Sequence, residues 1–247
     1  GLLFEGDLST LRSWGSFHIA PTICMPAVDS LTIFQINNYC GGSVIIGDKS
    51  FSDFSISGVD ANTVNVSGLD GGSVVDIIFN GQFSIISGVA DYNLQFKVTV
   101  LAEDWFITSI GQSMVASALN PDAFAQIDEQ VWSTGFGTGD PLGNSTLSTT
   151  NGDIIDPAAE FGDNLELSVA STMIWVQKDI GLNAGNLDSD LCRNSAPGFC
   201  GLGASATTIT QRFFQEREGD ADVPEPATML LFSTALLGLG FMRRKKS

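Results

Sequence analysis

Histidine is almost absent from this sequence of 247 residues, because His18 is the only one. Catalytic triads and most catalytic zinc sites depend on histidine. The sequence also lacks a Gly-x-Ser-x-Gly, a His-Glu-x-x-His and a phosphate-binding loop. A glycosidase needs only two carboxylates, but no pair stands out among the 28 acidic residues. We therefore expect that this protein is not an enzyme.

Charge is also scarce and mostly of one sign. Only 16% of the residues are charged, and the net charge is −17. Four of the eleven basic residues lie together near the C-terminus, and the others are scattered. Because nucleic-acid backbones require clustered Lys and Arg, we expect no nucleic-acid partner.

Cysteine is rare but its count is even, which suggests disulfides. The four residues form two sequence-local pairs, and the pairing we expect is Cys24–Cys40 and Cys192–Cys200. Each bond closes a short loop and adds about 2–3 kcal/mol. Buried free thiols and a metal site are the alternatives. Disulfides imply an oxidising compartment, so we expect an export signal that was removed or lies outside the given sequence, which begins at Gly1.

Short apolar alternations fill the first half of the chain. Residues with period two, such as Phe54 and Ile56 or Val64 and Val66, are typical of half-buried strands. Asp70-Gly71-Gly72 and Asn80-Gly81 are hairpin signals. The strands predicted here are Leu31–Ile36, Val44–Ile46, Phe51–Ser57, Thr63–Ser67, Val74–Phe79, Phe83–Ile86 and Leu94–Val100.

The second half predicts one helix, one long loop and further strands. Asn120-Pro121-Asp122 resembles a helix start, so a short helix is expected up to Trp132. Residues 136–164 are rich in Gly, Asp, Asn, Ser and Thr and predict a loop. Strand-like sequence resumes at Leu165–Lys178 and Ser205–Phe214. The fold class is therefore all-β: one β-sandwich or jelly-roll-like domain over residues 1–214 with one short helix.

Two binding hypotheses arise within this body. Oxygen side chains that alternate in a Gly-containing loop can ligate Ca²⁺, although such residues are more often ordinary turns. The weak candidates are Asn183, Asn186, Asp188 and Asp190, and otherwise we expect no metal or cofactor. The second hypothesis is a sugar-stacking surface formed by exposed Trp, whereas buried Trp would only fill the core. The tryptophans are Trp14, Trp105, Trp132 and Trp175.

The C-terminal part differs sharply in composition from the body. Residues 215–222 form an acidic stretch that predicts an exposed linker. Val223-Pro224-Glu225-Pro226 follows, and its two prolines hold the backbone extended. Residues 227–242 contain no charge and predict a helix of about 24 Å, short for a bilayer core of about 30 Å. The basic cluster Arg243-Arg244-Lys245-Lys246 is expected to stay in the cytoplasm.

This order of an extended Pro-Glu-Pro, a short apolar helix and a terminal basic cluster closely resembles the PEP-CTERM sorting signal. Residues 223–246 carry the resemblance. In the body, the segment from Cys40-Gly41-Gly42 to Phe54 and the run 176–180 resemble segments of uncharacterised β-rich proteins of that class.

The resemblance implies a route and a processing partner. A Gram-negative bacterium exports such proteins and holds them in its inner membrane by the tail, with the body in the periplasm. Exosortase, a membrane-embedded transpeptidase, recognises Pro224, Glu225 and Pro226, and Arg243 to Lys246 correspond to the stop-transfer cluster. The body then reaches the outer surface or the extracellular space. We expect a structural or adhesive protein associated with exopolysaccharide or biofilm. The alternatives are a secreted carbohydrate-binding or calcium-dependent adhesion module and, less favoured, a secreted glycoside hydrolase.

Overall fold

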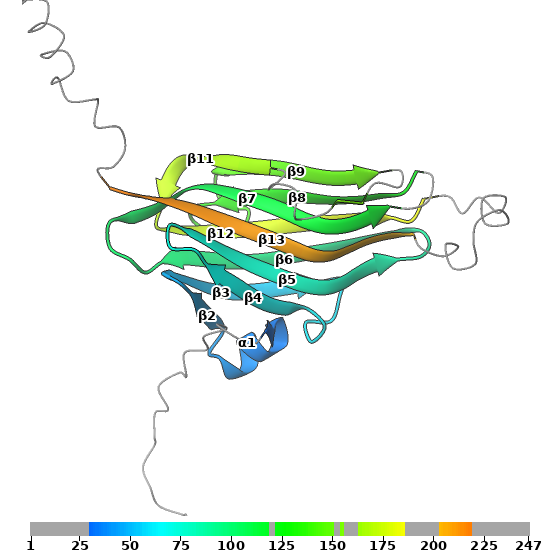
Figure 1. The fold of residues 1–247 in the computed structure, drawn as a ribbon, viewed down its shortest axis with the longest axis horizontal. Coiled ribbons are helices and arrows are strands. Elements are labelled where there is room, and N and C mark those ends of the chain that lie inside the picture. The colour runs from blue at the N-terminus through cyan, green and yellow to red at the C-terminus, as the bar shows by residue number, and fades with distance from the viewer. Residues whose placement is uncertain (1–29, 119–121, 151–153, 156–162, 186–202, 219–247) are drawn as a thin grey trace, which may run out of the picture.

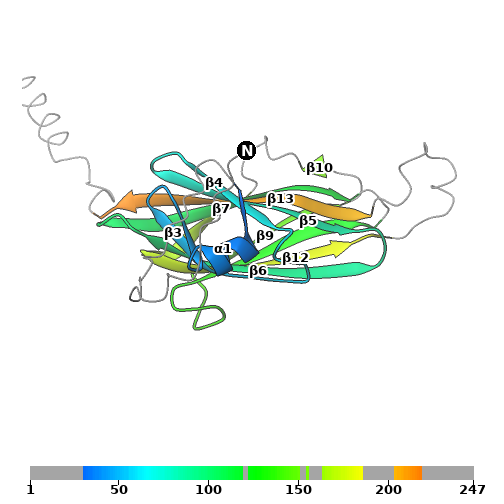
Figure 2. The ribbon, with the colours of Figure 1, turned by 90° about the horizontal axis from the view of Figure 1, so that it is seen from below.

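The computed structural model describes residues 30–118, 122–150, 154–155, 163–185 and 203–218. Two antiparallel sheets stacked in layers form the body (Figures 1 and 2). Sheet A has the order β2 (Ser43–Ile46), β3 (Lys49–Ser57), β6 (Val89–Val100), β12 (Met173–Asn183), β8 (Phe124–Trp132), β9 (Gly143–Thr150). Sheet B has the order β1 (Leu31–Thr32), β4 (Asn65–Asp70), β5 (Val74–Ile85), β13 (Ala204–Arg217), β7 (Trp105–Ala118), with β10 (Ile154–Ile155) and β11 (Asp163–Ser171) both paired to β7. The predicted all-β sandwich is thus confirmed.

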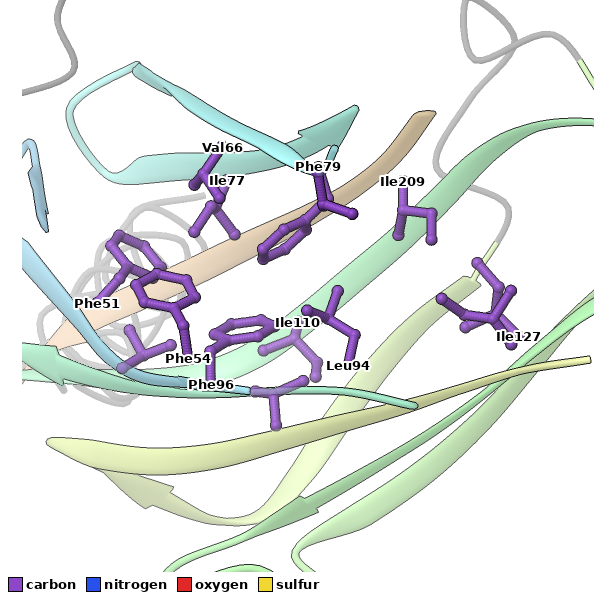
Figure 3. Packing of buried hydrophobic residues seen from close by; sticks show 14 of the residues in the cluster. Phe51, Phe54, Val66, Ile77, Phe79, Leu94, Phe96, Ile110, Ile127 and Ile209 are labelled. Atoms are coloured by element: carbon purple, nitrogen blue, oxygen red, sulfur yellow. The ribbon is translucent and has the colours of Figure 1, made fainter. Parts of the chain in front are cut away.

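Aromatic residues from both sheets meet in the core between the layers (Figure 3). The Phe96 ring of sheet A lies 5.2 Å from the Phe79 ring and 6.4 Å from the Phe213 ring, both of sheet B. Phe51 and Phe54 complete the group, and all five side chains are buried. Aromatic side chains bury large apolar areas, so this group joins the two layers.

Strand β6 shows why period two predicted the sheets correctly. Leu94, Phe96 and Val98 point into the core and are fully buried, while the residues between them are partly exposed. The predicted turn at Asp70-Gly71-Gly72 is also confirmed, because it joins β4 to β5 in an antiparallel pair. Gly72 adopts a φ of +84°, which glycine allows at low cost.

The first predicted strand, Leu31–Ile36, is wrong beyond Thr32. Residues Ile33–Tyr39 form helix α1, the one helix in the described residues. Thr32 caps it: its hydroxyl accepts from the backbone N–H of Gln35, and the Gln35 side chain accepts from the backbone N–H of Thr32. This capping box begins a helix, and Ile33 and Ile36 on one face are buried.

The hairpin predicted at Asn80-Gly81 does not exist, because Val74–Ile85 is one continuous strand. The apolar residues on both sides of Gly81 are in phase, so Phe79 and Phe83 face the same core. The pairing with β13 shifts by one residue between Ala206 and Thr208, opposite this point. A glycine inside a strand often marks such a bulge.

The helix predicted after Pro121 is wrong as well, since Phe124–Trp132 is strand β8. Phe124, Ile127 and Val131 would share one face of a helix, which favoured that prediction. Ile127 and Val131, however, are four positions apart, which also places them on one face of a strand. The spacing therefore could not distinguish the two structures. Pairing of β8 with β9 and β12 decides for the strand.

Two further boundaries differ from the prediction. The expected loop over residues 136–164 contains β9, whose Ser and Thr residues pair with β8, and the beginning of β11. The last strand continues to Arg217, because Gln215, Glu216 and Arg217 pair with β7. These three residues belong to sheet B and not to the acidic linker, which was predicted to begin at residue 215.

Helices that could cross a lipid bilayer are lacking from the residues that the structure describes. The predicted membrane helix 227–242 lies outside them, as do the Pro-Glu-Pro segment and the basic cluster.

Candidate functional site

Few of the residues singled out in the sequence fall in the described part of the chain. Cys40 is buried and disulfide-bonded, but Cys24, Cys192 and Cys200 lie outside, so the pairing stays a prediction.

Asn183, one of the calcium candidates, ends β12 and accepts a hydrogen bond from the Gly185 N–H at 2.9 Å. The other calcium candidates, Asn186, Asp188 and Asp190, lie outside as well. No group of three or more His, Cys, Asp or Glu side chains within the described ranges is placed to hold a metal ion.

The structure instead shows polar side chains in the middle of the sandwich, which we call the interior cluster: Gln112, Glu129, Lys178 and Gln211. All four are at most 1% exposed. Lys178 and Glu129 are cross-strand partners on β12 and β8 of sheet A. Gln112 and Gln211 are partners on β7 and β13 of sheet B. The cluster therefore bridges the two layers.

Lys178 makes the bonds that hold the interior cluster together. Its Nζ donates to Glu129 Oε2 at 2.5 Å and to Gln112 Oε1 at 3.0 Å. The Gln112 amide nitrogen donates to Ser145 Oγ at 2.8 Å. Since an ammonium can only donate, these contacts fix the carbonyl of Gln112 toward Lys178.

Apolar residues enclose the interior cluster along each strand. Val176 and Ile180 flank Lys178, and Ile127 and Val131 flank Glu129, all fully buried. Moving charges out of water is costly, and a buried pair offsets that cost only partly. Glu129 Oε1 and both amide atoms of Gln211 are buried without a hydrogen-bond partner in the described part of the structure. The interior cluster is therefore expected to stabilise the fold less than apolar side chains of similar size would.

A second buried lysine lies at the end of the sandwich where β2 turns into β3. Lys49 Nζ donates to Asp48 Oδ1 at 2.8 Å and to Gln215 Oε1 at 2.5 Å, and its side chain has no exposed area. The Gln215 amide donates to Asp48 Oδ2 at 2.7 Å. Burial lowers the pKa of Lys49, and its hydrogen bond to the Asp48 carboxylate partly opposes this.

Asp48 and Gln215 border a pocket of about 460 Å³, which we call the end pocket. Asp48, Asp70, Ser73, Trp105 and Gln215 contribute to its walls. A Cβ on Gly47 would lie 2.8 Å from the Asp70 carboxylate, so glycine at 47 allows this close approach. The end pocket thus combines a half-buried indole with two carboxylates.

Three aspartates lie close together on the outer face of sheet A. Asp179 is the cross-strand partner of Asp128, and Asp91 lies on the neighbouring strand β6. Burial, a hydrogen bond with Asp91 and the charges of Asp91 and Asp128 raise the pKa of Asp179 to about 6. Asp128 is held by Thr146 and Gln126 at 2.6 and 2.7 Å.

The sequence contained a signal for the interior cluster that residue types alone did not reveal. Lys178 occupies an inward position in the alternation of Ile174, Val176, Ile180 and Leu182 along β12. A charged residue in phase with an apolar series must be buried. Glu129 interrupts β8 between Ile127 and Val131 in the same way.

Comparison with known protein families finds a match, and it lies in the C-terminal part of the sequence. Residues 222–246 carry the PEP-CTERM protein-sorting motif. This confirms the resemblance recognised at residues 223–246. The motif indicates exosortase-dependent sorting of an exported protein, with exosortase as the processing partner. It also implies a membrane-anchored precursor that is processed to a secreted or surface form. No curated protein matches the chain.

Proposed function

We propose that this protein is a non-catalytic structural or adhesive component of the bacterial cell surface or extracellular matrix, delivered through its PEP-CTERM tail. The observation that carries the proposal is the motif at residues 222–246 behind a body made of a β-sandwich. On this account the basic cluster stops translocation, Pro224-Glu225-Pro226 is presented to exosortase, and cleavage releases the body.

The way the tail is attached supports a structural role. Strand β13 ends at Arg217, so only residues 218–221 separate sheet B from the sorting motif. Strand β13 lies between β5 and β7 and pairs with both along most of its length. Any pull on the tail is therefore resisted by two ladders of hydrogen bonds, which suits a protein held at a surface.

The sorting step is tested in the native host by mass spectrometry of the C-terminus. We expect released protein to lack residues 227–247, and a variant with Ala at 224, 225 and 226 to stay full-length and in the membrane fraction. The body substitution Val169→Ala, at a 64% exposed site, is the control and should be processed normally. Released protein with an intact Ser247 would contradict the proposal.

A second candidate function, binding of a matrix polysaccharide, rests on the end pocket. Sugar rings stack on aromatic faces, and carboxylates accept hydrogen bonds from hydroxyl groups. Trp105, Asp48 and Asp70 supply both kinds of group at one place.

Retention of the purified protein on the exopolysaccharide of its host tests this candidate. Trp105→Ala should lose retention. Trp175→Ala should keep it, because Trp175 lies on the outer face of sheet A beside Lys97. Equal retention of both variants would exclude the end pocket, and no retention of the unaltered protein would exclude the function.

A further inference from the structure

We propose that Lys178 and Gln112 join covalently in an intramolecular isopeptide bond, with Glu129 as the proton-transfer group. The product would be an amide between Lys178 Nζ and Gln112 Cδ, and ammonia would leave. The inference concerns the interior cluster only and does not depend on how the tail is processed.

The geometry places the nucleophile beside the carboxamide that contains the electrophilic carbon. Lys178 Nζ lies 3.0 Å from Gln112 Oε1. The carbon that the amine would attack, Gln112 Cδ, is bonded directly to that oxygen. The hydrogen bond from the Gln112 amide to Ser145 Oγ holds the carboxamide in this orientation. Holding two reacting groups in place in this way replaces a bimolecular encounter by an internal step.

Glu129 is placed to move the protons that this reaction requires. Its Oε2 accepts from Lys178 Nζ at 2.5 Å. Its Oε1 is buried and has no hydrogen-bond partner among the described residues, so it is open to a proton. Proton transfer from the ammonium to the carboxylate also replaces two buried charges by two neutral groups, which an apolar interior favours.

The step balances without an oxidant, a reductant or another reactant. Glu129 takes a proton from the Lys178 ammonium, and the free amine adds to Gln112 Cδ. Glu129 then gives its proton to the carboxamide nitrogen and takes one from the attacking nitrogen. The Cδ–N bond breaks, ammonia leaves and carries off this last proton as ammonium, and Glu129 is again a carboxylate.

Gln211 is the neighbour of Gln112, the residue on which negative charge would develop. It is the direct cross-strand partner of Gln112, and its amide nitrogen has no hydrogen-bond partner among the described residues. A donor aimed at a developing oxyanion stabilises the tetrahedral state. Gln211 is therefore assigned as the donor to the oxyanion, and its orphaned amide is the group that this reaction would use.

The Lys49 set also combines a lysine, a carboxylate and a glutamine but lacks two of these conditions. Both oxygens of Asp48 are already bonded, one to Lys49 and one to Gln215. The Asp48 side chain is also 26% exposed beside the end pocket. We therefore expect no bond between Lys49 and Gln215, which makes this set a control within the same molecule.

Mass spectrometry of the purified full chain tests the proposal directly. Cleavage after glutamate separates residues 104–129, which contain Gln112, from residues 167–216, which contain Lys178. We expect these two peptides to be joined after disulfide reduction, with a mass about 17 Da below their sum, the loss of one ammonia. Separate peptides at their full masses would overturn the proposal. So would a loss of about 18 Da linking Lys178 to Glu129, or a bond mapped to Lys49 and Gln215 alone.

Variants give a second measurement. Glu129→Gln keeps the size of the side chain but not its basicity, and it removes one cleavage site, so residues 104–160 and 167–216 should appear as two separate peptides. The Tm should fall by about 10 °C. The Gln211→Met variant should still form the bond between Lys178 and Gln112. A time course after refolding should show that the bond forms several-fold more slowly than in the unaltered protein. Lys49→Met, the matched control, should keep the 104–129 to 167–216 link. If the two peptides of Glu129→Gln remained linked, the role of Glu129 would be refuted. The existence of the bond itself is tested on the unaltered protein, so that test holds even if a variant fails to fold.

Discussion

The Phe96 ring of sheet A packs between Phe79 and Phe213 of sheet B, with ring centroids 5.2 and 6.4 Å away. This contact is the centre of the aromatic core. Because Phe96 is fully buried, its removal would leave a cavity that neither sheet can close.

Phe96→Ala should lower the free energy of unfolding by about 3–5 kcal/mol, measured by urea denaturation. Ile86→Ala, at a 68% exposed position, serves as the control and should change stability by no more than about 0.5 kcal/mol. A loss below about 1 kcal/mol at Phe96 would contradict the core described above.

Gly68→Ala should destabilise the fold by about 1–3 kcal/mol through overpacking. A Cβ at this site on β4 would lie 2.3 Å from the Ile46 side chain of β2 in the opposite sheet. Ile46→Ala in the Gly68→Ala background should cost less than Ile46→Ala alone, as a double-mutant cycle would show.

Gly181→Ala is the matched control for this cycle. The nearest atom to its added Cβ is 3.8 Å away in Phe124, an ordinary contact. Stability should stay the same or rise slightly, since glycine in a strand costs about 0.5–1 kcal/mol relative to alanine. Equal losses at both glycines would show that the contact with Ile46 has no effect.

Asp179→Asn should remove part of the pH dependence of stability. The folded state binds the Asp179 proton more tightly than the unfolded chain, because its pKa is raised to about 6. This carboxyl therefore contributes most stability below its unfolded pKa near 4, and loses that contribution as the pH rises through 6. Thermal melts should show a higher Tm than the unaltered protein at pH 7.5 and a much smaller difference at pH 4.

Gln177→Asn, on the same face of β12 but neutral, is the control for that series and should leave the pH profile unchanged. A constant Tm difference between Asp179→Asn and the unaltered protein at every pH would exclude the carboxyl group of Asp179 as the cause.

Thr32→Ala should cost about 1 kcal/mol by removing the cap of α1. Thr32→Ser retains the hydroxyl that accepts from the Gln35 N–H at 3.1 Å and should restore most of the loss. Equal stability of both variants in urea would mean that the capping box does not hold the helix.

The fold class could be predicted from the sequence because alternating residues such as Leu94, Phe96 and Val98 record a half-buried strand directly. Local pattern failed where two structures share it. The spacing of Ile127 and Val131 suits helix and strand equally, and pairing with β9 and β12 decided between them. The Thr32 and Gln35 capping box was present in the sequence, but the apolar alternation around it predicted a strand.

The apolar alternation around Lys178 and Glu129 signals their burial, but the contacts within the interior cluster could not be predicted, for a different reason. Lys178 and Gln112 are 66 residues apart and come from different sheets. Their meeting depends on the register of four strands, which no short segment determines. The sorting motif, in contrast, lies within one continuous segment, so its recognition did not require the fold.

The central position of β13 determines when the body can fold. Among the described strands it is the last to be synthesised, yet β5 and β7 each need it as a neighbour. Until residues 204–217 have emerged, both of those strands have open edges and Phe213 is missing from the core. Sheet B therefore cannot close until almost all of the described part of the chain has been made, so the step that completes the fold comes late in synthesis.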